Sequence, residues 1–186
     1  MFIYGIHPIE EILERAPSIA KRLFFAGTLD QPQFKRIQEL VAEENISVIR
    51  SDARELEEMA RGGNHQRVVL ETGPFPYTEL DALIEATKDK ERACLVILEQ
   101  VQDSGNLGAI LRSAAAMGVD GVIIPKDRAA QVNETAIRAS AGLAMSVPVA
   151  LVTNVARTLG ELKEHGYWTV GAVLEGAQDL WTMDFN

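Results

Sequence analysis

The sequence predicts an α/β fold in which two units of alternating helices and strands are joined by a proline-rich break. Short apolar runs typical of strands alternate with stretches whose apolar residues recur at helical spacing. The run Gly73–Pro76 interrupts this alternation, because two prolines so close together cannot continue a central strand. Beyond the break, strands and helices alternate again, which predicts a parallel sheet covered by helices on both faces.

The first unit, residues 1–73, is predicted to be a compact α/β domain. Helical spacing of apolar residues predicts helices around residues 9–16, 34–41 and 56–60, the last of which should end at the glycine pair 62–63. Apolar runs predict strands at residues 23–26, 46–49 and 68–70.

Residues 74–91 are predicted to be a linker that contains a helix at 78–88, and residues 92–186 form the second unit. Its apolar runs predict strands at 94–98, 122–124, 147–152 and 168–174. Helical spacing predicts helices at 106–115, 133–144 and 155–162, with Gly166 ending the last one.

The composition excludes several classes of protein. Hydrophobic residues make up 47% of the 186 residues and charged residues 24%, which is typical of a soluble globular chain. No apolar run reaches the roughly 18–20 residues of a membrane span. The first residues, Met1–His7, lack the basic and apolar segments of a signal peptide. We therefore expect a cytoplasmic protein without membrane contact.

The cysteine, the histidines and the overall charge bear on three classes of function: thiol chemistry, metal binding and nucleic-acid binding. The single cysteine, Cys94, lies in the apolar run Ala93–Leu98, where we expect a buried, reduced thiol. The three histidines form no cluster with it, so we expect no metal site. The net charge of −9 counts against nucleic-acid binding, because proteins of that class usually carry a basic excess.

The loop Gln100–Asn106 is the predicted site of chemistry. It follows the strand 94–98, and ligands of parallel α/β sheets bind beyond the carboxyl ends of the strands. Asn106 falls at the predicted helix start, where its side chain can cap backbone N–H groups. Arg112 lies six residues further on and can hold a phosphate through its planar guanidinium.

The residues alone leave two interpretations of this loop equally open. Asn106 and Arg112 can form a ligand site, or they can be only a helix cap and a surface charge. Gly105 and Gly108 permit close backbone approach in either case. The loop has neither a Walker A sequence nor a G-x-G-x-x-G pattern, which disfavours ATP and nicotinamide cofactors.

The second unit resembles the SpoU (TrmH-type) family of RNA 2′-O-ribose methyltransferases. The stretch Asp103–Arg112, followed by Gly118–Pro125, is similar to the first motif of that family: Asn-x-Gly, an Arg in the next helix, then a small-residue turn into an apolar strand. The segment Ser140–Gly142, with Val147 and Pro148 beyond it, resembles the family's Ser-x-Gly and Val-Pro segment.

The first unit resembles the substrate-binding domain of the same family, which is similar to ribosomal protein L30e. The similarity lies in Gly5–Leu13 and Asn64–Gln66, although Arg67 stands where the family usually has Gly. The resemblance therefore implies an L30e-like substrate-binding domain at 1–73. It implies the N-terminal part of a trefoil-knot (SPOUT) methyltransferase domain at 92–186.

The resemblance also implies an activity, a cofactor and partners. Bacterial 23S rRNA guanosine 2′-O-methyltransferases are the most similar group, so the expected reaction is methylation of a ribose in rRNA, or in tRNA, from S-adenosyl-L-methionine. Asn106 and Arg112 would be catalytic. Gly171, Ala172 and Val173 would touch the cofactor at the end of the strand 168–174. The full-length enzyme is expected to be a homodimer.

Basic side chains are the candidates for contacts with RNA phosphates. We expect Arg22, Arg128 and Arg138 to make such contacts. Each basic residue alone is more often only a solvated surface charge. The wider set of candidates is Arg15, Lys21, Lys35, Arg36, Arg67 and Lys126.

The family carries two further motifs, a Gly-x-Glu-Gly-like turn and a Ser-Leu-Asn-x-Ser loop, which form the knot and most of the donor pocket. The sequence ends at Asn186, before either motif. We therefore expect a chain truncated before the knot, with poor binding of the methyl donor and doubtful activity on its own.

Two other interpretations remain. The chain can be a non-catalytic RNA-binding protein, in which an L30e-like module is joined to a degenerate methyltransferase half. It can also be a small-molecule α/β enzyme, which would bind a nucleotide or an acid at the loop Asp103–Asn106 and would have no affinity for RNA. Binding of RNA separates the second of these from the first.

Overall fold

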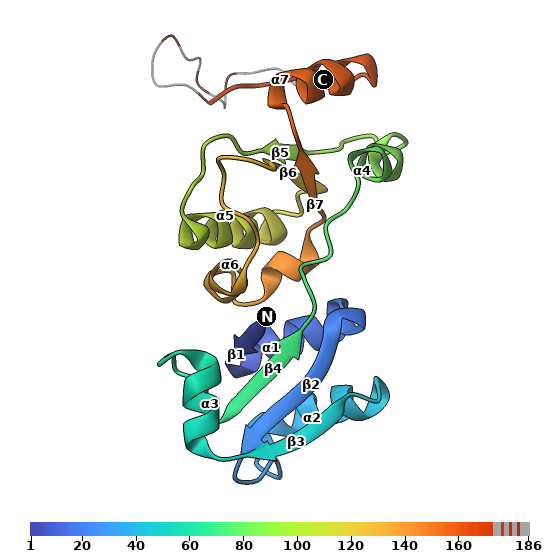
Figure 1. The fold of residues 1–186 in the computed structure, drawn as a ribbon. Helices are drawn as coiled ribbons and strands as arrows, with labels where there is room; N and C mark the ends of the chain where they lie inside the picture. The colour runs from blue at the N-terminus through green and yellow to red at the C-terminus, as the bar shows by residue number, and fades with distance from the viewer. Residues whose placement is uncertain (173–175, 177–178, 180–181, 183–186) are drawn as a thin grey trace.

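The computed structural model describes residues 1–172, 176, 179 and 182. Figure 1 shows two sheets in separate bodies, with the N-terminal body at the bottom and the second body above it. The first sheet has the strand order β1-β4-β2-β3, and the second has the order β5-β6-β7. Both predicted α/β units are therefore present, one on each side of the break at Gly73–Pro76.

The first sheet is mixed. Its strands are β1 (Phe2–Tyr4), β2 (Ala20–Ala26), β3 (Ser47–Ser51) and β4 (Val68–Thr72). β4 pairs antiparallel with both β1 and β2, whereas β3 pairs parallel with β2. The three predicted strands are confirmed, and β1 is an element that the sequence pattern did not predict.

Helices cover both faces of this sheet. They are α1 (Ile6–Arg15), α2 (Lys35–Glu43) and α3 (Ala53–Ala60), with 3-10 turns at Pro17–Ile19 and Pro32–Phe34. α1 and α2 share one apolar cluster with the inward side chains of the strands, and α3 packs on the other face through Leu56. A capping box of Asp52 and Glu55 starts α3, and left-handed Arg61 and Gly62 end it, which confirms the predicted stop.

The second sheet is parallel, as predicted. β5 (Leu95–Ile97), β6 (Gly121–Pro125) and β7 (Val149–Val152) pair in that order. Alternate residues of β6 enter different clusters. Val122 and Ile124 pack with α5 (Ser104–Ala116) and α6 (Glu134–Ala139), and Ile123 packs with α4 (Leu80–Thr87) and α7 (Val155–Glu164). Helices therefore cover both faces.

The second unit differs from the predictions in three details, of which the first is a helix end. The helix predicted at 133–144 ends at Ala139, because Ala141 and Gly142 adopt left-handed φ angles of 55° and 90° before a 3-10 turn at Leu143–Ser146 (η3). The backbone N–H of Gly142 then donates to the carbonyl of Ile137 at 2.8 Å, which is a Schellman-type helix end.

Cys94 is exposed, so the predicted buried thiol is wrong. It precedes β5, which has a neighbour on only one side among the described strands. An apolar run shows that residues prefer burial, but it does not show whether the strand lies at the edge of its sheet.

The predicted strand 168–174 is also wrong over residues 168–172, where the structure describes no strand. Trp168 is 94% exposed and Val170 is 53% exposed. Apolar spacing produces a strand only where a neighbouring strand offers free backbone groups, and residues 168–172 pair with no strand that the structure describes. Val173 and Leu174 lie outside the described residues.

An ion pair at the start of β6 links it to the segment before β5. Asp120, whose side chain is 12% exposed, pairs with Lys90 and accepts a hydrogen bond of 2.7 Å from the backbone N–H of Cys94. Burial acts to raise the pKa of Asp120, but the bonds from Lys90 and Cys94 outweigh it, so this pKa lies below its ordinary value.

Asp120→Asn is therefore expected to make the free energy of unfolding depend less on pH in the acid range. A carboxylate of lowered pKa stabilises the fold above its unfolded pKa of 3.8. That contribution is lost as the pH falls through the lower folded pKa. Urea unfolding at pH 7 and pH 3 measures the effect. The difference in unfolding free energy between the parent chain and the variant should shrink at pH 3, and an equal difference at both pH values would contradict the assignment.

Candidate functional site

The carboxyl ends of β5 and β6 bring two loops together. The backbone N–H of Ala130 donates to the carbonyl of Val101 at 2.7 Å. The side-chain amide of Asn133, at the start of α6, donates to the hydroxyl of Ser104, at the start of α5, at 3.0 Å. The loops 98–103 and 126–133 therefore lie side by side at the edge where parallel α/β sheets bind their ligands.

Asp103, and not Asn106, caps α5. The Asp103 carboxylate accepts a hydrogen bond of 2.7 Å from the backbone N–H of Asn106. The helix begins at Ser104, so Asn106 already lies in its first turn. The prediction that Asn106 caps the helix is therefore wrong. Asp and Asn cap helices about equally well, and a carboxylate also interacts favourably with the helix dipole. The Asn106 side chain is thereby free for another role.

Asn106 and Arg112 lie on the exposed side of α5. The exposed positions 106, 109 and 112 recur every three residues, and the buried positions include Leu107 and Leu111. Six helical residues place Asn106 and Arg112 about 9 Å apart along the axis. No hydrogen bond or ion pair engages either side chain among the described residues, so both can meet a ligand.

A partly buried network that the sequence did not reveal supports the second loop. The backbone N–H of Val132 donates to the hydroxyl of Tyr77 at 2.9 Å, and that hydroxyl donates to Gln131 at 3.3 Å. Gln131 in turn donates to the carbonyl of Pro125 at 3.0 Å. Burial raises the pKa of Tyr77, so its hydroxyl stays neutral and holds the loop by hydrogen bonds alone.

The described part of the predicted cofactor segment does not form a pocket. Gly171 and Ala172 are exposed, and no atom lies within 4 Å of the position that a Cβ at Gly171 would take. Val173 lies outside the described residues. An open hollow of about 460 Å³ lies beside this segment, lined by Lys163 and residues 166–169. These residues do not enclose a nucleoside.

The predicted RNA contacts lie in three different places. Arg22, on β2, pairs with Glu71 at 2.6 Å and lies over the ring of Phe24. Arg128 is exposed in the loop 126–133 of the site. Arg138, on α6, is half-buried against Tyr4. Arg128 is therefore the member of this set that lies on a site loop without a described partner.

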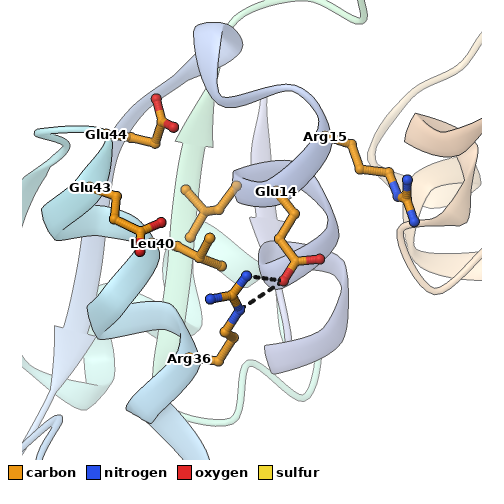
Figure 2. A pocket seen from close by; sticks show the side chains of 7 residues that line it. Glu14, Arg15, Arg36, Leu40, Glu43 and Glu44 are labelled. Carbon is orange, nitrogen blue, oxygen red and sulfur yellow. Dashed lines mark hydrogen bonds and ion pairs between the residues drawn. The ribbon is translucent and has the colours of Figure 1, made fainter.

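A second hollow, of about 350 Å³, lies between α1 and α2, away from the site (Figure 2). Arg36 donates to Glu14 there at 2.7 Å, and Glu43 and Glu44 also line it. Arg15 also lines this hollow, and its guanidinium pairs with Glu11 at 3.0 Å. The carboxylates make it unsuited to an RNA phosphate, and they occupy the guanidinium of Arg36.

The described residues contain no group of His, Cys, Asp and Glu side chains that would hold a metal ion. None of their helices has the length and apolar character needed to cross a membrane.

Family comparisons match both units. Residues 93–186 match the model of the SpoU rRNA methylase family. Residues 2–78 match the model described as RNA 2′-O ribose methyltransferase substrate binding. Both matches agree with the resemblance on which Asn106 and Arg112 were predicted.

Individual relatives are similar over nearly the whole chain. The 23S rRNA (guanosine-2′-O-)-methyltransferase RlmB of Pseudomonas aeruginosa is 39% identical over 99% of this chain and 74% of its own length. A putative TrmH family tRNA/rRNA methyltransferase of Staphylococcus haemolyticus is 40% identical over 95% of this chain and 71% of its own length. These shares do not by themselves support the prediction of a fragment, which stays a prediction.

Solved structures show the same fold. The AdoMet-bound rRNA methyltransferase of Sinorhizobium meliloti superimposes with a TM-score of 0.75 at 23% identity, over 98% of this chain. This chain spans 65% of the length of that structure. The likeness extends through both sheets and is evidence of a shared fold.

Proposed function

The chain belongs to the SpoU rRNA methylase family, and we propose from this premise that it methylates a ribose 2′-hydroxyl of ribosomal RNA. The observation that carries the proposal is that α5 begins at the carboxyl edge of the second sheet, with Asn106 exposed in its first turn and Arg112 exposed further along the same helix. 23S rRNA is the favoured substrate because the RlmB relatives carry that RNA in their names.

Arg112 is proposed to orient the substrate. A guanidinium is effectively always protonated, so it is a poor base, but its fork of N–H donors can hold a phosphate and a neighbouring hydroxyl together. Asn106 offers one amide acceptor and two donors near the helix start. Alignment of the 2′-oxygen, more than proton removal, is then the contribution of these two residues.

Arg128 is the proposed phosphate contact at the site. It is exposed, and it lies on the loop that a hydrogen bond from Ala130 to Val101 joins to the loop before α5. Since the net charge is −9, attraction of RNA must come from such local positive charge against the overall field.

S-adenosyl-L-methionine is the proposed methyl donor, because a solved relative of the same fold is described as AdoMet-bound. The donor would supply an electrophilic methyl group. Gly171, Ala172 and Val173 stay proposed contacts, and their described part is open. Weak donor binding by this chain therefore stays a prediction, as do a homodimer and a cytoplasmic location.

Transfer of a labelled methyl group tests the proposal. The chain is incubated with 23S rRNA and methyl-tritiated S-adenosyl-L-methionine, and the RNA is then hydrolysed in alkali. A 2′-O-methyl group blocks cleavage at its own nucleotide, so label in an alkali-resistant dinucleotide is the expected result. RNA that binds but gains no label, at a donor concentration shown by titration to saturate the chain, would overturn the proposal and favour the non-catalytic RNA-binding interpretation. Absence of RNA binding would favour a small-molecule enzyme.

A further inference from the structure

The N-terminal unit contacts the second unit at α6, through Tyr4 and Arg138. We propose that Tyr4 and Arg138 dock the N-terminal unit onto α6 in one orientation, and that Arg138 is a positioning residue for the substrate and not a phosphate ligand. The docking needs no assumption about activity, whereas the positioning of substrate rests on the proposed function. In Figure 1, α1 and α6 lie between the two sheets, where the two units meet.

The guanidinium of Arg138 is engaged from two sides. Its Nη1 donates a hydrogen bond to the hydroxyl of Tyr4, and its Cζ lies 4.3 Å from the centre of the Tyr4 ring. Its Nε donates to the carbonyl of Glu134 at 3.3 Å. A half-buried cation over an aromatic ring gains more than an exposed one, so an RNA phosphate would compete with Tyr4 for this group.

Tyr4 is itself held by the N-terminal unit. Its ring packs against a buried cluster that includes Phe24, Leu56 and Val69. A Cβ added at Gly63 would lie 1.9 Å from the Tyr4 hydroxyl, so glycine is required there for the hydroxyl to take this place. The sequence of the first unit thus leaves room for the side chain that reaches across to α6.

The backbone approaches closely at the other end of the same contact. Gly142 has a φ of +90°, and a Cβ on it would lie 2.9 Å from Cα of Pro8 and 2.7 Å from Cβ of Glu11. One cluster of buried apolar residues continues from Ile9 in α1 to Ile137 in α6. Packing of this kind holds two units in one arrangement, whereas a linker alone would leave them free to rotate.

α6 connects the docked unit to the candidate site. It starts at Asn133, whose side chain donates to Ser104 in α5, and it reaches Arg138 within six residues. The helix that receives the N-terminal unit is therefore also bonded to the helix that carries Asn106 and Arg112. RNA held on the first unit would be presented to α5 in a fixed geometry.

The docking is tested by a distance measurement on the free protein. Cys94 is the single cysteine and is exposed, so it takes one spin label. Arg54→Cys on α3, where the parent side chain is 86% exposed, takes the second. We expect pulsed electron–electron double resonance to give one narrow distribution of the distance between the two labels. After Tyr4→Ala or Arg138→Gln, the distribution should be broad.

Matched variants keep this test decisive. Arg157→Gln changes an exposed arginine on α7 and should leave the distribution narrow. Gly142→Val should also broaden the distance distribution, because its side chain would clash with α1. Gly160→Val, at a glycine whose Cβ would have nothing within 4 Å, should leave the distribution narrow. Circular dichroism checks that each variant is folded. A narrow distribution in folded Tyr4→Ala, or a broad one in the parent chain, would overturn the docking proposal.

The positioning role is tested separately by methylation kinetics. Tyr4→Ala leaves the Arg138 guanidinium in place but removes its anchor. If Arg138 acts through docking, Tyr4→Ala and Arg138→Gln should each raise the KM for RNA by about tenfold, with less change in kcat. If Arg138 is a phosphate ligand, Tyr4→Ala should leave KM unchanged or lower it. The distance measurement uses no RNA, so failure of the proposed function does not affect it.

Discussion

Arg112→Ala is expected to lower kcat/KM for RNA methylation about a hundredfold or more while leaving the stability of the fold unchanged. Loss of one group that aligns a reacting oxygen typically costs about that factor. Arg112 is exposed on α5, and surface substitutions without partners usually change stability by less than about 0.5 kcal/mol. Methyl transfer and urea unfolding, measured on the same preparation, separate the two effects.

Two control variants sharpen this prediction. Arg112→Lys keeps the charge but loses the planar fork, so it should recover RNA affinity more than it recovers transfer. Arg157→Ala removes an exposed arginine from α7 and should have no effect on kcat/KM. If Arg112→Ala retains the transfer rate of the parent chain, Arg112 is only a surface charge.

The elements that sequence patterns predicted best are those with a signal inside their own segment. The helix around residues 56–60 has apolar spacing and a glycine stop, and α3 ends there. β1 has no such signal, since it covers only Phe2–Tyr4 and exists through pairing with β4. A three-residue segment is too short for alternation to be recognised, and the residues with which it pairs lie far along the chain.

The candidate site was predictable to the extent that it depends on local order. Asn106 and Arg112 were found from their spacing within one motif, and both are exposed on α5. The contact of Arg138 with Tyr4 spans 134 positions in the chain. No periodicity links such residues, so Arg138 looked like any other basic side chain until the two units were seen together.

Gly108 is expected to be the most sensitive position of the site to a small change. A Cβ there would lie 2.4 Å from the carbonyl oxygen of Ala136 and 2.7 Å from Cβ of Ala139. Both atoms belong to α6, and one is backbone, so α5 and α6 would have to separate. The sequence indicated only that this glycine permits close backbone approach, and the structure shows that the approaching backbone is that of α6.

Two opposing effects decide the outcome of Gly108→Ala. Alanine favours a helix interior over glycine by about 1 kcal/mol, whereas overpacking a buried contact costs about 1–3 kcal/mol and sometimes more. Contacts below 3 Å to backbone fall at the severe end of that range. We therefore expect a net loss of about 2 kcal/mol in the free energy of unfolding, measured in urea.

Gly160→Ala is the matched control for this substitution. Gly160 lies in α7 with nothing within 4 Å of its would-be Cβ, so only the helix-propensity gain operates and the variant should be slightly more stable. Separation of α5 from α6 would also break the bond from Asn133 to Ser104, so Gly108→Ala should lose methyl transfer even where it remains folded. A variant as stable and active as the parent chain would show that α6 is not held against α5 as described.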